Sequence, residues 1–378
     1  MIALVLVGAD SACAQAPASP SRVQLGVAVD TTRTSRNTWG YDPAMDSVSA
    51  VVRTWEAFAV VRGHAPADAH WSALDRTRHT QPDLAVVEAT FLAQTTSTLL
   101  EVVPLTAGDA TDFQLLVLHS VGTPPVALAI ERVLMTLEAG RYVLRHPIHT
   151  ETASWQRARA GPIDYVVHPE LSFDVEQARA AAAWVDTVAA RFGLGSIERL
   201  TYYQVPDLQA SRALKGLDWF PSADRLGGTA DVKNRIVWAG DPRHGSGFRH
   251  EIAHVLFGSL LAESHPILTE AVAYWLAGTR DMDAPMALQS ARVFARGRRG
   301  LSLERILESE EHPAASLRFA SAALLLDWVH QQRGDEGVLQ LLRTHPRTDI
   351  SVTTLATALG MQPRELEAAW QRLIQASE

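Results

Sequence analysis

The chain has 378 residues, of which 47% are hydrophobic and 20% are charged. This composition supports substantial buried cores, allows two domains and excludes an intrinsically disordered protein. The formal net charge of −8 argues against a general nucleic-acid partner. The single cysteine excludes a disulfide within the chain, a cysteine-based metal site and thiol catalysis.

Residues 1–16 form a short apolar stretch that ends in small residues, as in a signal peptide. We therefore expect an exported protein, periplasmic or extracellular, although a short strand is the alternative for this stretch. Cleavage before Cys13 would allow a lipid anchor on that residue, but Asp10 is unfavourable in a lipoprotein signal. The stretch is too short to span a membrane, and no later apolar run reaches the length required.

Residues 22–155 are predicted to form a small α+β domain. A helix is expected over residues 48–61, where apolar residues recur at three- and four-residue steps. Strands are expected at 98–103, 113–118, 127–137 and 141–144, with a hairpin turn at 138–140. One helix followed by an antiparallel sheet resembles the NTF2-like group. The histidines show no ligand spacing, so docking or control of access is the expected role; they are His64, His70, His79, His119 and His146.

Residues 160–378 are predicted to form a second α+β domain that begins with a small mixed sheet. Strands are expected at 163–167, 200–205 and 235–238, and helices at 175–192 and 209–214. A further helix then crosses the sheet. A C-terminal helical lobe follows, with helices at 266–278, 286–296, 302–308, 316–332, 335–342, 351–358 and 363–376.

The helix that crosses the sheet carries the sequence His-Glu-Ile-Ala-His at residues 250–254, an HExxH pattern. Residues four apart share one face of a helix, so His250 and His254 can bind the same metal ion. Glu251 can reach a metal-bound water without occupying a coordination position, which is the geometry of a general base. Apolar neighbours predict a buried helix. A chance match in a chain with 14 histidines is the alternative.

Glu270 is the candidate for a third ligand. A catalytic zinc usually has three protein ligands and one water. Glu270 stands in the largely apolar segment 266–276, where an unpaired carboxylate is costly to bury unless it binds a metal. Its alternative role is to complement the dipole at the helix N-terminus. We expect one Zn²⁺ ion, bound by His250, His254 and Glu270.

The HExxH pattern, a connector of fifteen residues and the segment 268–274 resemble the gluzincin branch of the zinc metallopeptidases. More narrowly, they resemble the bacterial peptidase MA-like domains, over about residues 160–378. The resemblance implies a zincin-like fold, a peptide or protein substrate, and Glu251 as the base. It also implies that an edge strand holds an extended peptide; the residues concerned are Asn234, Arg235, Ile236, Val237 and Trp238.

One feature departs from the gluzincin pattern. These enzymes usually add a Tyr or His that stabilises the oxyanion, whereas Phe319 stands where related chains have a tyrosine. Tyr274, His312, Arg318 and His265 remain as candidate donors, and Tyr274 is also a candidate for supporting a ligand from behind. An exported, non-catalytic binding or assembly module with or without structural zinc is therefore the alternative function.

Other hydrolase signatures fit less well. A metzincin needs histidine at position 260, where this chain has Leu260. Residues 278–281 match the Gly-Thr-x-Asp element of aspzincins without its tyrosine, so Asp281 is the second choice for the third ligand. The absence of a G-x-S-x-G elbow excludes an α/β serine hydrolase.

Overall fold

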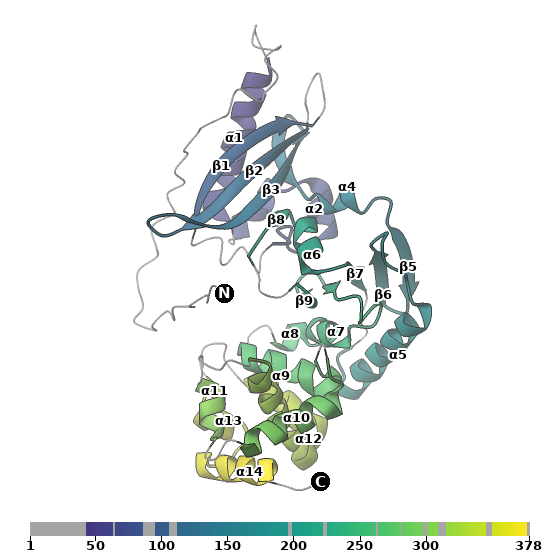
Figure 1. The fold of residues 1–378 in the computed structure, drawn as a ribbon, viewed down its shortest axis with the longest axis vertical. Coiled ribbons are helices and arrows are strands. Elements are labelled where there is room, and N and C mark those ends of the chain that lie inside the picture. The colour runs from purple at the N-terminus through teal and green to yellow at the C-terminus, as the bar shows by residue number, and fades with distance from the viewer. Residues whose placement is uncertain are drawn as a thin grey trace.

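The structure is a computed structural model in which three parts follow one another along the longest axis (Figure 1): a sheet with helix α1, a second sheet, and a group of helices. It describes residues 43–62, 65–85, 95–105, 112–195, 199–221, 225–261, 264–279, 281–297, 301–308, 315–344 and 350–375. The predicted signal segment, Cys13 and His312 lie outside these residues. None of the described helices is long and apolar enough to cross a membrane.

The first sheet is an antiparallel meander. Its strands in spatial order are β1 (Thr96–Pro104), β2 (Asp112–Val121), β3 (Val126–Glu138) and β4 (Arg141–Arg145). Burial alternates along β2, so Phe113, Leu115 and Val117 share one face. That face packs on Trp55 and Phe58 of α1 (Pro43–Val61), which lies across the sheet (Figure 1). The predicted helix and four strands are confirmed, whereas the resemblance to the NTF2-like group stays a prediction.

The predicted hairpin between β3 and β4 is also confirmed. Glu138 pairs with Arg141, which leaves a two-residue turn of Ala139 and Gly140. Both have positive φ, 48° and 79°, as in a type I′ turn. A glycine at the second position avoids the steric cost that a side chain has there.

Three short helices and one strand connect the first sheet to the rest of the chain. The helices are η2 (Ala65–His70), α2 (Ala73–Arg78) and α4 (Ile148–Glu151). Strand β8 (Leu217–Trp219) pairs antiparallel with β3, although it comes from the second half of the chain. The first sheet is therefore completed by residues beyond the predicted boundary near residue 155.

The second sheet is mixed, with the order β5-β6-β7-β10-β9. Its strands are β5 (Gln156–Ala160), β6 (Ile163–Val167), β7 (Leu200–Gln204), β9 (Gly227–Asp231) and β10 (Ile236–Gly240). Strands β6, β7 and β10 are parallel, and β5 and β9 run antiparallel at the two edges. The three inner strands were predicted from their apolar runs. The two polar or glycine-rich edge strands were not.

The prediction that residues 234–238 form an edge strand is wrong. Ile236, Val237 and Trp238 lie in β10, which is hydrogen-bonded to β7 on one side and β9 on the other. Asn234 and Arg235 belong to the turn that precedes it. The run is apolar because both faces of an inner strand are buried, and an apolar run does not show whether a strand lies at an edge. Strand β9 occupies the edge.

Each face of the second sheet is covered by a different part of the chain. Tyr202 and Val237 point to the large core that includes α5 (Val175–Phe192) and α7 (Arg249–Leu256). Tyr203 and Trp238 point to the opposite face, where Leu84, from the part of the chain that precedes the first sheet, packs against them. One face of the second sheet therefore packs on α7, and the other face packs on this N-terminal segment.

The C-terminal part is helical, as predicted. Its helices are α8 (Gly258–Leu261), α9 (Pro266–Ala277), α10 (Ala284–Gly297), α11 (Leu303–Glu308), α12 (Ala315–Thr344), α13 (Val352–Ala358) and α14 (Pro363–Gln375), and α6 (Leu208–Leu214) precedes β8. Residues Ala315–Thr344 (α12) are interrupted by a kink at Gly334, whose φ of 65° is not helical, so the two helices predicted at 316–332 and 335–342 are confirmed. The predicted α+β class is confirmed for the described residues.

Candidate metal centre

The start of α7 is fixed by a tyrosine from the sheet beneath it. The hydroxyl of Tyr202 donates to the carbonyl of Gly245 at 2.8 Å and accepts the amide of Phe248 at 3.1 Å. The latter residue is the N-cap of α7, and its own side chain makes no capping hydrogen bond. Ile252 and Ala253, one turn further, are fully buried. These contacts hold His250 and His254 against the interior, as predicted.

Helix α9 brings the third candidate ligand to α7, against which it packs. Pro266 starts α9, and the ring of His265 accepts the amide of Ile267 as its cap. At the other end, the carbonyl of Gly278 lies 2.8 Å from Nδ1 of His250. A carbonyl only accepts, so Nδ1 carries a hydrogen, and in the neutral ring Nε2 is the nitrogen that can bind a metal.

The three candidate ligands converge. Nε2 of His250 lies 3.4 Å from Oε2 of Glu270, and Nε2 of His254 lies 3.5 Å from Oε1 of the same carboxylate. One ligand atom from each residue lies within 4.8 Å of the others. Two ligands with bonds of about 2.0–2.1 Å to a tetrahedral ion stand about 3.3 Å apart. The spacing of these three side chains therefore fits Zn²⁺.

Protonation at this cluster is uneven. Burial lowers the pKa of His254 to about 4, which leaves its ring neutral at physiological pH. Burial opposes the charge on His250 as well, but the hydrogen bond and charge of Glu270, with the charge of Glu251, raise its pKa. Burial would raise the pKa of Glu270, and the two histidines outweigh burial and lower it. Glu270 is therefore a carboxylate, as a metal ligand has to be.

Glu251 lies beside the ligands and is 7% exposed. Burial raises its pKa to about 7; the charge of Glu270 adds to the shift and the charge of His250 opposes it. A carboxyl group whose pKa lies near neutrality can both accept and return a proton at physiological pH. Such a pKa is compatible with the general-base role of Glu251, which stays a prediction.

The sheet edge passes directly over this glutamate. A Cβ atom on Gly228 of β9 would lie 2.5 Å from Cγ of Glu251 and 2.7 Å from Cε1 of Phe248. Real Cβ atoms do not approach other atoms so closely, so only glycine lets β9 lie this near α7. Gly228 is not among the site residues predicted from the sequence; the pair Gly227-Gly228 shortly before an apolar strand is the signal that could have indicated it.

The other predicted residues have separate contacts. The ring of Tyr274 lies edge-on to His250, with centroids 5.2 Å apart, and its centroid lies 6.0 Å from that of Phe319. Burial raises the pKa of Tyr274, so its hydroxyl stays protonated. Arg318 donates to the carbonyls of Ile306 and Leu307.

The second choice for the third ligand, Asp281, accepts from Arg243 at 2.9 Å and is not part of the three-residue cluster. His265 caps α9, and His312 lies outside the described residues. Tyr274 is thus the predicted donor that the structure places in contact with a candidate ligand.

Comparisons with known proteins give limited similarity. No protein-family model matches the chain, and no curated protein matches it. Among solved structures, it is similar to an M1 zinc metallopeptidase mutant from Deinococcus radiodurans bound to a Tyr-Ser-Ala substrate. The identity is 15%, the TM-score is 0.38, and the match covers 74% of this chain and 63% of that one.

A second similar structure is a two-domain M1 zinc metallopeptidase mutant bound to L-tryptophan. The identity is 13%, the TM-score is 0.37, and the match covers 75% of this chain and 64% of that one. The chain therefore spans less than two thirds of the length of either of these structures.

Proposed function

We propose that the protein is an exported zinc-dependent peptidase of the gluzincin type, periplasmic or extracellular, in which His250, His254 and Glu270 bind one Zn²⁺. One observation carries this proposal. Two imidazoles from α7 and a carboxylate from α9 stand at ligand spacing, and Glu251 is buried beside them with a pKa of about 7. When bound, zinc polarises a water molecule and lowers its pKa towards neutrality.

Glu251 accepts the proton of the attacking water and passes it to the leaving amine. Its position one residue after His250 puts its carboxylate at the cluster without making it a ligand. Its burial removes competing water, and its pKa near 7 makes both proton transfers accessible at neutral pH. A purely structural zinc site has no need of a carboxylate at this position.

The substrate backbone adds to β9 as a further strand. The strand lies at the sheet edge, hydrogen-bonded on one side to β10, and Gly228 brings it against Glu251. A peptide paired with this edge is recognised through its main chain, so side-chain selectivity along it is weak. This assignment replaces the inner strand that the sequence had suggested.

The alternative function is a non-catalytic module that keeps zinc or keeps only the fold. The observation that favours it is Phe319, which packs on Tyr274 and offers no hydroxyl for an oxyanion. Retention of a buried Glu251 beside the ligands favours the peptidase.

The experiment that separates the two functions is hydrolysis of an internally quenched peptide library by the zinc-loaded chain and by Glu251→Gln. Glu251→Gln is expected to keep zinc and lose hydrolysis, and His254→Ala to lose both. Exposed Glu304 provides the matched control, Glu304→Gln, which keeps both. A zinc-loaded wild-type chain that cleaves no library peptide would overturn the peptidase proposal.

A further inference from the structure

A second group of metal-binding side chains lies at the junction between the two sheets, outside the proposed catalytic centre. Asp75 in α2 and His79 at its C-cap are four residues apart, and His149 comes from α4. One ligand atom from each residue lies within 4.8 Å of the others. We call these three residues the junction cluster.

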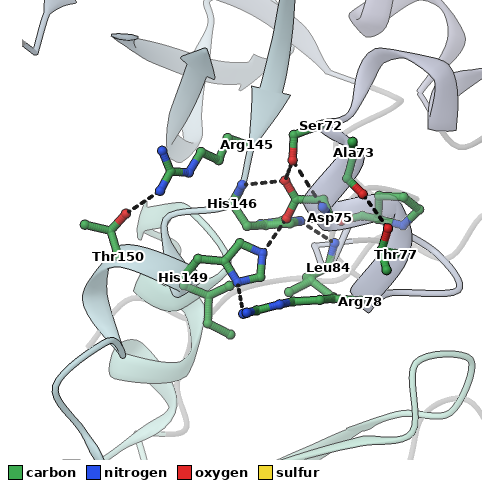
Figure 2. A network of polar contacts seen from close by, with 12 residues as sticks. Ser72, Ala73, Asp75, Thr77, Arg78, Leu84, Arg145, His146, His149 and Thr150 are labelled. Carbon is green, nitrogen blue, oxygen red and sulfur yellow. Dashed lines mark hydrogen bonds and ion pairs between the residues drawn. The ribbon is translucent and has the colours of Figure 1, made fainter. Parts of the chain in front are cut away.

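Asp75 is the fixed point of the junction cluster. It is fully buried; Oδ1 lies 2.7 Å from Nε2 of His149, and Oδ2 accepts the hydroxyl of Ser72 (Figure 2). Burial would raise the pKa of Asp75, but the hydrogen bonds from His149 and Ser72 and the charge of His146 outweigh burial and lower it. Asp75 is therefore an ionised carboxylate in the interior, held by hydrogen bonds and able to bind a cation.

His79 supplies an available lone pair. Its ring is 8% exposed, packs 5.7 Å from the ring of His149, and has its Nε2 atom buried without a hydrogen-bond partner among the described residues. Burial, followed by the charges of His146 and His149, lowers its pKa to about 3. The ring is therefore neutral. A buried polar atom without a partner is costly, and an ion or water is a common explanation for one.

We propose that Asp75, His79 and His149 form a second divalent-metal site, selective for a zinc-type ion, that ties α2 to α4. Two imidazole nitrogens and a carboxylate oxygen are the donor set that such an ion takes, with water in the fourth position. We assign the site a structural role, because Asp75 is fully buried and the two rings are largely shielded from solvent. This proposal is independent of the peptidase assignment.

Arg78 competes with the ion for His149, and this competition gives the proposal a specific test. Its Nη1 lies 3.0 Å from Nδ1 of His149 (Figure 2). A guanidinium only donates, so Nδ1 accepts and Nε2 of His149 carries the hydrogen given to Asp75. Metal binding at Nε2 moves that hydrogen to Nδ1, where it faces the donor of Arg78. Arg78 is exposed, so its side chain can turn to solvent when the ion binds.

Opening the hydrogen bond between Asp75 and His149 is the other requirement. Their 2.7 Å separation has to reach about 3.3 Å for both to bind one tetrahedral ion. The four-residue helix α4 carries only one of these ligands, so a small shift of His149 suffices.

The junction cluster also lies next to a contact with the sheet edge. The backbone N–H of Gln81, two residues after His79, donates to Oδ1 of Asn234 at 2.8 Å. The side-chain amide of Asn234 donates back to the carbonyl of Gln81 at 2.8 Å. Asn234 belongs to the turn between β9 and β10. An ion at the junction cluster therefore steadies the loop that holds this turn.

The test is zinc stoichiometry after equilibrium dialysis, measured by mass spectrometry on the full chain. We expect two ions on the wild-type chain, one on His79→Ala, one on His254→Ala and none on the double variant. His70→Ala, which changes another histidine of the same region, is expected to keep two. In the His254→Ala background zinc raises the melting temperature, and in the double variant it does not.

Arg78→Met gives a measurement that loss of folding cannot imitate. Removing the competing donor is expected to tighten zinc binding at the junction cluster about tenfold, in the range seen for groups that surround metal ligands. A His254→Ala chain that is folded by circular dichroism and binds no zinc would overturn the proposal. A wild-type chain whose only ion survives His254→Ala and is lost in His79→Ala would instead overturn the catalytic assignment.

Discussion

Two clusters of this molecule have similar ligands and different spacing. In the catalytic candidate, Glu270 stands 3.4 and 3.5 Å from its two histidines, close to the separation that a shared ion requires. In the junction cluster, Asp75 and His149 stand 2.7 Å apart and are joined by a hydrogen bond. The first cluster is held ready for an ion by α7 and α9. In the junction cluster the hydrogen bond between Asp75 and His149 has to break before an ion can bind, so we expect this cluster to bind zinc more weakly.

The surroundings of the two clusters separate their roles further. Glu251 and the sheet edge at Gly228 lie beside the catalytic candidate, where a base and a substrate strand are required. Arg78, a cation, lies beside the junction cluster and competes with any ion there. Ligand type alone does not distinguish a reactive metal site from a structural one; the groups that surround the ligands do.

The largest expected effect is the loss of activity in Glu251→Gln. Removal of a general base lowers kcat by about 10²–10⁴-fold. Zinc content is expected to stay at the wild-type value, because the substituted residue is not a ligand. Undiminished cleavage by Glu251→Gln would show that Glu251 is not the base that distinguishes the catalytic candidate from the junction cluster.

Gly228→Ala tests the approach of the sheet edge to the catalytic candidate. The added Cβ meets Glu251 and Phe248 at less than 3 Å, so β9 or the glutamate has to move. A displacement of about 1 Å near reacting groups costs about 10²-fold in rate. Gly297→Ala is the control, since a Cβ at Gly297 meets nothing within 4 Å. Equal kcat/KM values for the two variants would show that the position of β9 does not affect catalysis.

Tyr274→Phe tests whether the hydroxyl of this ring, which packs edge-on against His250, contributes to the metal site. We expect zinc affinity to fall about tenfold, as for other groups that surround metal ligands. A competition titration with a chelating dye measures this change. A loss below about threefold would assign Tyr274 to packing alone, since losses from supporting groups are larger.

The smallest expected effect is on the pH dependence of stability in metal-free protein. The pKa is about 4 for His254 and about 3 for His79, against about 6.5 for an unfolded histidine. As pH falls below about 6.5, the unfolded chain takes up these protons first, so folding stability decreases. Each ring contributes at most about 1.4 kcal/mol per pH unit, a contribution that ends near its folded pKa.

Urea unfolding between pH 7 and pH 4.5 measures this dependence. His79→Asn and His254→Asn are each expected to reduce the slope of stability against pH. A slope that is unchanged in both variants would contradict the assignment of the two rings as buried and neutral.

The catalytic candidate could be predicted from sequence because its main signals are local. The HExxH spacing depends only on helix geometry, and Glu270 is conspicuous as a carboxylate in an apolar helix. The edge strand was misplaced because an apolar run identifies a buried strand and not its neighbours. Gly227-Gly228-Thr229 has no alternating pattern, so β9 left no strand signal.

The junction cluster could not be found in the same way. Asp75 and His79 have the spacing of a ligand pair, but His149 lies 70 residues after His79. It reaches them only because β4 leads into α4 beside α2, as its hydrogen bond to Asp75 shows. The histidines of this region therefore appeared scattered in the sequence, and tertiary structure brings them together.

The most direct test of the central claim is a crystal structure of the zinc-loaded chain with anomalous data at the zinc edge. We expect a peak about 2.0–2.2 Å from Nε2 of His250, Nε2 of His254 and a carboxylate oxygen of Glu270, with the Glu251 carboxylate facing a bound water. A peak that lacks Glu270 as a ligand, or no peak between α7 and α9, would contradict it.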